Sequence, residues 1–73
     1  MTVVVNGEET QVIDGASVVA VIEALGLKPE RVAVEVNQKI IRRPEWTSTA
    51  LSEGDRVEIV HFVGGGSAVV AFA

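Results

Sequence analysis

The sequence predicts an α+β domain in which one α-helix lies across one face of a mixed β-sheet. Three observations support this prediction. Several short runs are rich in valine, which favours strands. A single segment has the apolar spacing of a helix, and turn-forming pairs such as Asn6-Gly7 separate the runs. The resulting order is β-β-α-β-β-β, and 73 residues are enough for one domain.

The first two strands are expected to form a hairpin. Valines at 3–5 favour a strand, and Asn6-Gly7 suits a two-residue type I′ turn, in which both residues have positive φ. The helix is expected over residues 17–25, with Ser17 capping its start and Gly26 ending it. Its apolar residues recur at positions i, i+3, i+4 and i+7, namely Val18, Val21, Ile22 and Leu25.

The second half is expected to supply three more strands. Valines alternate with other residues over 32–36, Asn37-Gln38 is the predicted turn, and a short strand follows over 39–42. A connector then leads to the last strand at 56–63, with Trp46 and Leu51 expected to anchor it under the sheet. The side chains expected to meet the helix are Val3, Val5, Val32, Val34, Val36, Val57 and Ile59.

Composition excludes several classes of function. The chain has no cysteine and a single histidine, His61, so we expect no catalytic residues and no metal site. A net charge of −4 disfavours nucleic acid as a partner but suits docking on a basic protein surface. Because no apolar run approaches the roughly 20 residues that span a bilayer and no signal peptide is recognisable, we expect a cytoplasmic protein that does not bind membranes.

The carboxyl-terminal residues divide the chain into two parts. Residues 1–63 are expected to form the folded domain, and residues 64–73 a flexible glycine-rich tail with an extension. Three glycines, Gly64–Gly66, follow the last strand directly, and the extension "SAVVAFA" comes after them. Glycine lacks a Cβ, so a glycine thread can enter a channel too narrow for other residues.

The stretches "NQKIIRRPEW" and "LSEGDRVEIVHFVGGG" closely resemble the ThiS-like sulfur carrier proteins of thiamine biosynthesis. These proteins have the ubiquitin-like β-grasp fold, which they share with MoaD-like relatives. The resemblance covers residues 1–66. Its most specific part is the last strand, beginning at Gly54-Asp55 and ending in the three glycines.

The resemblance implies a protein cosubstrate, not an enzyme, with no bound cofactor of its own. An adenylating enzyme (ThiF-like) would use ATP to activate the carboxylate of Gly66, with Gly64 and Gly65 as the thread behind it. Sulfur would then displace AMP and leave a thiocarboxylate on Gly66. A thiazole synthase (ThiG-like) would receive that sulfur and build the thiazole ring of thiamine.

The extension Ser67–Ala73 departs from the family pattern, because Gly66 is followed by a peptide bond and has no carboxylate to activate. The chain is therefore expected to be a precursor that a processing protease shortens. Two other interpretations remain open at this point. One is a sulfur carrier for cysteine, homocysteine or molybdopterin synthesis, and the other is a ubiquitin-like modifier or interaction domain.

A partner-docking surface is expected on the face of the sheet opposite the helix. If Val57 and Ile59 face the helix, Val60 and Phe62 must face the other way. In a β-grasp sheet the first and last strands are neighbours, which would place Val4 beside them. Clustered apolar residues on an open sheet face usually mark an interaction site.

Overall fold

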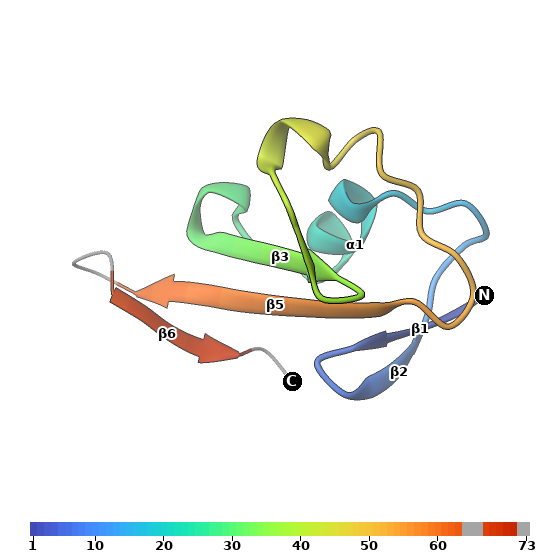
Figure 1. Ribbon diagram of the computed structural model, residues 1–73, viewed down its shortest axis with the longest axis horizontal. Helices are drawn as coiled ribbons and strands as arrows, with labels where there is room; N and C mark the ends of the chain where they lie inside the picture. Colours follow the sequence, from blue (N-terminus) through green and yellow to red (C-terminus); the bar gives the residue numbers. More distant parts are fainter. Residues whose placement is uncertain (64–66, 72–73) are drawn as a thin grey trace.

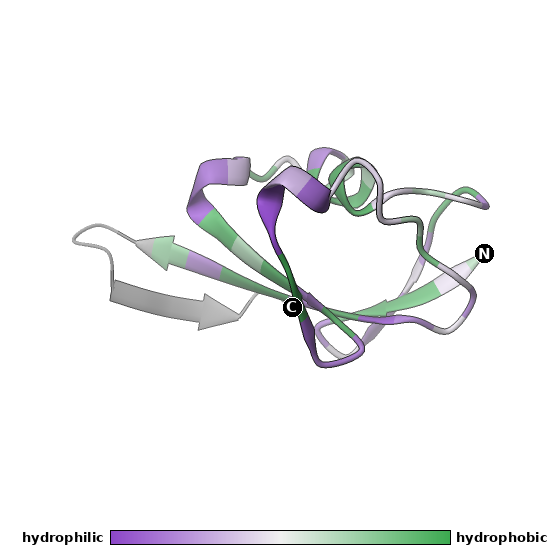
Figure 2. Cartoon of the chain, turned by 45° about the horizontal axis from the view of Figure 1, so that its top comes forward, coloured by the Kyte–Doolittle hydropathy of each residue, from purple (hydrophilic) through white to green (hydrophobic). Residues whose placement is uncertain are grey.

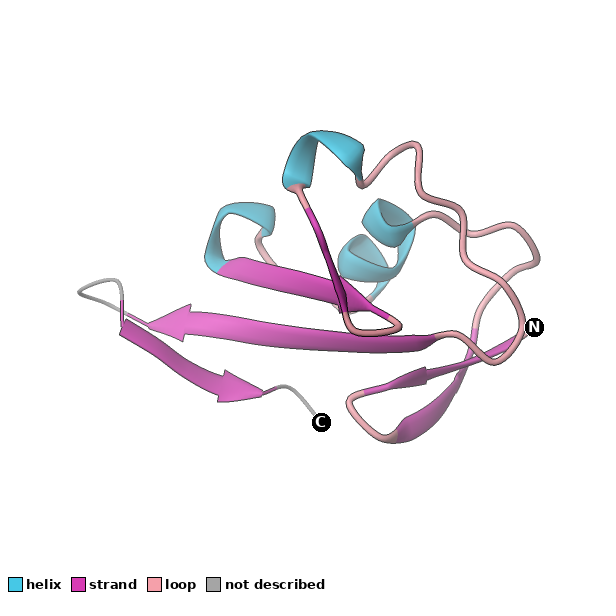
Figure 3. Cartoon of the chain, viewed as in Figure 1, coloured by secondary structure: helices cyan, strands magenta, loops and turns pink. Residues whose placement is uncertain are grey.

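A computed structural model of the chain describes residues 1–63 and 67–71. They form one sheet with the strand order β2-β1-β5-β3-β4, and β6 pairs with β5 (Figure 3). The helix α1 lies on one side of this sheet (Figure 1). The elements in chain order are β1 (Thr2–Val5), β2 (Glu8–Gln11), α1 (Val18–Ala24), the 3₁₀ helix η1 (Pro29–Arg31), β3 (Val32–Val36), β4 (Lys39–Ile41), the 3₁₀ helix η2 (Arg43–Glu45), β5 (Arg56–Val63) and β6 (Ser67–Ala71).

The expected fold class is confirmed. The sheet is mixed, because β1 runs parallel to β5 whereas every other described pair of strands is antiparallel. The five expected strands are present, and they match the β-grasp order in which the first and last strands of the domain are neighbours. β6 is a further strand that the sequence analysis did not predict.

Both hairpin turns form where the sequence places them. Asn6 and Gly7 have φ values of 49° and 85°, and Asn37 and Gln38 have 51° and 70°. Positive φ at both central residues is the requirement of a type I′ turn. The turns set the register, so that Val5 lies opposite Glu8 and Val36 opposite Lys39.

The helix is short and capped at both ends. The Ser17 hydroxyl accepts a hydrogen bond from the backbone N–H of Ala20 at 3.2 Å. At the other end, Gly26 has φ of 72°, and the N–H groups of Gly26 and Leu27 bond to the carbonyls of Glu23 and Ile22 at 3.0 and 3.2 Å. This pair of bonds is the Schellman motif, which glycine permits at no steric cost.

The core lies between α1 and the sheet. It is built from the side chains expected to meet the helix, and Figure 2 shows the central strands as largely hydrophobic and the β3–β4 turn as hydrophilic. Leu25 differs from the expectation, because as the C-cap it is 40% exposed. The buried cluster is Val3, Val5, Val18, Val21, Ile22, Val32, Val34, Val36, Trp46, Leu51, Val57 and Ile59.

The long connector before β5 is fastened to the domain at several points. Trp46 and Leu51 are both buried, as expected, and the Trp46 indole N–H donates to the carbonyl of Ile41 at 2.8 Å. The N–H of Leu51 donates to the carbonyl of Ala16 at 2.8 Å, which ties the connector to the start of the helix. These bonds hold the connector against the core although it contains little regular structure.

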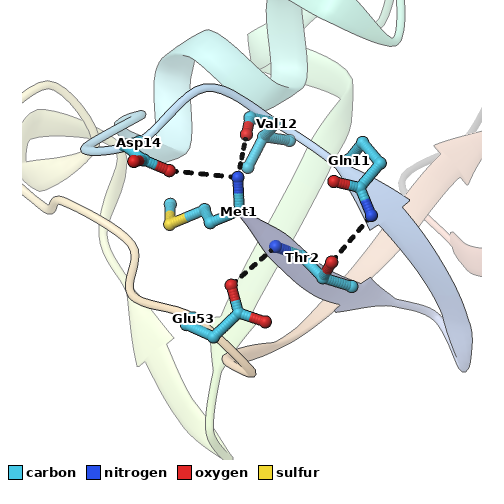
Figure 4. Close-up of polar contacts among 6 residues, drawn as sticks. All are labelled: Met1, Thr2, Gln11, Val12, Asp14 and Glu53. Carbon is cyan, nitrogen blue, oxygen red and sulfur yellow. Dashed lines mark hydrogen bonds and ion pairs between the residues drawn. The ribbon is translucent and has the colours of Figure 1, made fainter.

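The amino terminus is held by polar contacts on both sides (Figure 4). The Met1 amino group donates to the carbonyl of Val12 at 2.7 Å and forms an ion pair with Asp14 at 3.1 Å. The N–H of Thr2 donates to the carboxylate of Glu53 at 2.9 Å. The turn before β5 is thereby attached to the start of β1, which aligns the two parallel strands.

β5 is the central strand, and three different partners cover one of its edges. β1 pairs with its first two residues, where Val4 lies opposite Arg56 and Val5 opposite Val57. The Asn6 side chain then replaces a strand: its amide oxygen accepts from the N–H of Ile59 at 2.8 Å, and its amide nitrogen donates to the Ile59 carbonyl at 3.1 Å. β6 pairs with the remainder of the strand, from Val60 to Val63.

The tail predicted to be flexible contains a strand. Ser67–Ala71 form β6, which runs antiparallel to the end of β5 with a bulge where the register passes from His61 to Phe62. Gly64–Gly66 and residues 72–73 lie outside the described residues. Flexibility of residues 64–73 therefore stays a prediction about motion, and order parameters from NMR relaxation would measure it.

Removing the Asn6 amide should lower the stability of the domain. Asn6→Gly keeps the turn, because glycine accepts positive φ, but it deletes two partly buried hydrogen bonds to β5. We expect the free energy of unfolding in urea to fall by about 2 kcal/mol.

Asn37→Gly is the matched control for this substitution. Asn37 has a similar φ and also makes two side-chain hydrogen bonds, to Asp55 and to the N–H of Arg56, but these are exposed. Losing these two exposed hydrogen bonds should lower the free energy of unfolding by no more than about 1 kcal/mol. An equal loss from both substitutions would contradict a special role for the Asn6 amide.

Candidate functional site: the end of β5 and the outer face of the sheet

β5 ends at one extremity of the domain, and Gly64 is the next residue in the sequence. Val63 closes β5 and Ser67 opens β6, and the two residues lie opposite each other in the ladder. The end of β5 points away from the amino terminus, at the opposite end of the molecule (Figure 1). The predicted thiocarboxylate residue Gly66 and its thread, Gly64 and Gly65, lie outside the described residues, so their roles stay predictions.

The register of the sheet shows which docking residues share a face. Residues opposite each other in neighbouring strands point to the same side, and alternate residues of one strand do so as well. Val4 lies opposite Arg56. Arg56 shares its face with Glu58, Val60 and Phe62. The three predicted docking residues are therefore all on the face that turns away from α1.

The structure brings Val60 and Phe62 together but leaves Val4 apart. Val4 stands beside the first residue of β5, and Val60 is four residues further along, about 13 Å at about 3.3 Å per residue. Glu58 occupies the position between them. Val4 is therefore on the expected face and on the expected neighbouring strand, but it does not lie beside Val60 and Phe62. The reason is that β1 is short and pairs only with the first two residues of β5.

Two apolar residues of the same face were missed in the sequence. Ala33 lies opposite Val60, and Ile40 lies opposite Glu35, which in turn lies opposite Glu58. Ile40 is 72% exposed, which is unusual for a large apolar side chain in a strand. The signal was present in the sequence, because a strand that begins after the turn at Asn37-Gln38 places Ile40 on the outer face.

The outer face therefore combines apolar and acidic parts. Ala33, Val60 and Phe62 form its apolar end, next to the point where β5 meets the glycines. Glu35 and Glu58 lie opposite each other beside it, and Arg56 lies on the same face two residues before Glu58. Such a face suits a partner whose surface has an apolar centre and a charged rim.

Two shallow pockets lie elsewhere on the described part of the molecule. A groove of about 310 Å³ between the end of β2 and α1 is apolar and is flanked by Ile13, which is 77% exposed. A second hollow of about 280 Å³ is lined by residues of β3 and β4 together with Arg42, Arg43 and Trp46. Neither brings a nucleophile together with a general base, so neither has the composition of a hydrolytic site.

The strand order, with the first and last strands of the domain parallel and adjacent and one helix on the sheet, defines a ubiquitin-like β-grasp protein. Comparison with known families narrows this class. The ThiS family model matches residues 3–66, which is most of the chain. The chain belongs to the ThiS family.

Solved structures agree with this assignment. The crystal structure of the thiamine biosynthesis protein ThiS from Geobacter metallireducens is similar with a TM-score of 0.78 and 33% identity, covering 90% of this chain and 100% of that one. The solution structure of a thiamine biosynthesis protein from the same organism has a TM-score of 0.75 and 33% identity, over 92% of this chain and 90% of that one.

Sequence relatives include longer proteins. A thiazole synthase from Paramagnetospirillum magneticum is 40% identical over 92% of this chain, and one from Magnetococcus marinus is 38% identical over 90%. The chain spans only about a fifth of the length of these synthases, 21% and 20% respectively. The uncharacterised protein ycf40 of Porphyra purpurea is 30% identical over 90% of this chain and 93% of its own length.

The described residues contain no helix that could cross a lipid bilayer. The α-helix α1 has seven residues, far fewer than the roughly 20 that a bilayer requires.

Proposed function

We propose that this protein is a sulfur carrier of thiazole formation in thiamine biosynthesis, and that it carries sulfur as a thiocarboxylate on Gly66. It acts as a cosubstrate that partner enzymes load and unload. The observation that carries the proposal is the family match, which begins in β1 and ends at Gly66. The part of the chain that resembles ThiS proteins thus ends at the residue whose carboxylate the chemistry needs.

The proposed chemistry needs a carboxylate at the end of a thin chain. A carboxylate oxygen of Gly66 would attack the α-phosphate of ATP, with pyrophosphate leaving, and a sulfur nucleophile would then displace AMP. In the present chain Gly66 is bonded to Ser67, so the amide offers no carboxylate. Removal of residues 67–73 by a protease would create one, and three glycines would let it pass through a narrow channel.

The partners follow from the same reasoning. An adenylating enzyme (ThiF-like) binds the ATP, because this chain contains no recognisable nucleotide-binding motif of its own. A thiazole synthase (ThiG-like) takes the sulfur. This second partner is supported by the two relatives named thiazole synthase, in which a segment like this chain is part of a longer polypeptide. Two sequences joined in one chain commonly act on the same substrate.

The outer face of the sheet is the proposed docking surface for these partners. Val60 and Phe62 lie on the strand that leads to Gly66, so a partner bound there also receives the tail at a fixed distance. Val4, Ile40 and the acidic pair Glu35 and Glu58 would extend the contact. Binding energy obtained at this body would hold the reacting end in place, which serves the chemistry without any catalytic group on the carrier.

Removal of the extension should switch on adenylation. We expect a chain ending at Gly66 to support ATP-dependent pyrophosphate release with its cognate adenylating enzyme and, after addition of sulfide, to gain the mass of a thiocarboxylate. The chain ending at Ala73 should do neither, because its own carboxylate follows Phe72, and that side chain does not fit a channel shaped for glycine.

A chain ending at Gly66 with Gly65→Val is the matched control for this experiment. It has the carboxylate but a branched side chain in the thread, so it should react poorly. If the chain ending at Ala73 were adenylated as well as the chain ending at Gly66, the proposal that residues 67–73 prevent adenylation would be refuted. Inactivity of the chain ending at Gly66, with an enzyme that adenylates another ThiS protein, would refute the sulfur-carrier proposal.

Charge on the apolar end of the outer face should weaken docking. In the chain ending at Gly66, Phe62→Asp would bury an unpaired carboxylate in the complex. We expect the dissociation constant for the adenylating enzyme or the thiazole synthase, measured by titration calorimetry, to rise at least about tenfold, which corresponds to about 1.4 kcal/mol.

Ile13→Asp provides the control for this substitution, because Ile13 is exposed but lies in the groove beside α1. It should leave both affinities unchanged. Val4→Asp tests how far the surface extends along β5. The docking assignment is wrong if Phe62→Asp binds both enzymes as tightly as the parent chain.

A further inference from the structure

The described part of β5 is longer than the strands beside it. On one edge β3 ends with Val32 opposite His61, and on the other edge β1 ends with Val5 opposite Val57. Among the described strands, β6 is the one that pairs with β5 at Phe62 and Val63. A strand edge that projects beyond its neighbours presents backbone groups ready to pair with another extended segment.

The Asn6 side chain reveals which backbone groups point to this edge. It bonds to both the N–H and the carbonyl of Ile59, so those two groups point toward β1 and not toward β3. Backbone groups alternate in direction along a strand. The N–H and carbonyl groups of His61 and Val63 therefore point to the same edge, toward β6, and those of Glu58 and Val60 point toward β3.

The segment that occupies this edge has a definite chemistry. β6 has the sequence Ser-Ala-Val-Val-Ala, without charge and with small or β-branched side chains. It lies beyond residue 66, where the match to the ThiS family ends. The edge of β5 therefore lies within the part of the chain that matches the ThiS family, whereas β6, which pairs with it, lies in the extension.

We propose that the edge of β5 from Val60 to Val63 is a strand-binding site, occupied in this chain by β6 and open to an uncharged extended segment of a partner once β6 is removed. Pairing would be through main-chain hydrogen bonds, as in other cases of strand addition to a sheet edge. This inference goes beyond the proposed function, because it assigns an interaction site that needs neither ATP nor sulfur. The extension would then have two effects, blocking the Gly66 carboxylate and filling the site.

The pairing is tested first in the full chain by hydrogen exchange of backbone amides. Val70 lies opposite His61, so its N–H points toward β5, and that of the next residue, Ala71, points away. Val70→Pro should speed exchange at His61 and Val63 about tenfold or more. Ala71→Pro should have much less effect, and the amides of Glu58 and Val60 should be unchanged in both variants.

The site itself is tested with the chain ending at Gly66 and a synthetic peptide of sequence SAVVAFA. The described core residues all precede Val60, and the ThiS protein from Geobacter metallireducens matches over its whole length, so this shortened chain retains a complete core. We expect the peptide to shift the amide resonances of residues 60–63 and to restore slow exchange at His61 and Val63. The peptide carrying Val70→Pro should do neither.

Peptide concentrations of the order of millimolar are needed, because that is the effective concentration a short linker provides to a tethered segment. The proposal is overturned if SAVVAFA at that concentration leaves residues 60–63 unaffected. It is also overturned if Val70→Pro leaves exchange at His61 and Val63 as slow as in the parent chain. Neither outcome depends on an adenylating enzyme, so each is distinguishable from a failure of the sulfur-carrier proposal.

Discussion

The architecture depends on satisfying the edge of β5 that faces away from β3. This strand runs through the middle of the sheet for eight residues, and no neighbouring strand among the described residues is as long. A buried backbone group without a partner is costly, so the stretch of the edge at the buried residues Val57 and Ile59 needs cover. β1 covers the start, the Asn6 amide covers Ile59, and β6 covers the end. The hairpin turn at Asn6-Gly7 thus serves the central strand as well as its own hairpin.

The sequence could predict the body of this fold because its local signals agree with one another. Alternating valines, two positive-φ turn pairs and one capped helix each specify an element, and together they leave one compact arrangement. Trp46 and Leu51 were recognisable as anchors because large apolar residues in a polar connector have nowhere else to pack. Leu25 was expected on the apolar face of the helix but is partly exposed. It is the C-cap residue, where the helix ends and its periodicity no longer fixes the direction of the side chain.

The relations between strands were harder to predict. Alternation places Val4 on the outer face, but only the register shows that a short parallel β1 leaves it opposite Arg56, far from Val60. The bonds from Asn6 to Ile59 join residues 53 positions apart, and no local pattern announces them. β6 was missed for a different reason: three glycines normally favour flexibility, yet the uncharged, valine-containing segment after them has good strand propensity and meets an open edge.

Under the proposed function, an extension that keeps Gly66 in a peptide bond and also pairs with the edge of β5 has a consequence that a flexible tail lacks. A protease that removed the extension would bind it in an extended conformation, and because residues 67–71 pair with β5, cleavage would compete with this pairing. The strength of the β5–β6 ladder would therefore set how readily the carrier is activated. After such a cleavage the peptide would leave, because its pairing would no longer be intramolecular and the effective concentration that favours the pairing would be lost. The carboxylate and the strand edge would then become available in the same step, at the same end of the molecule.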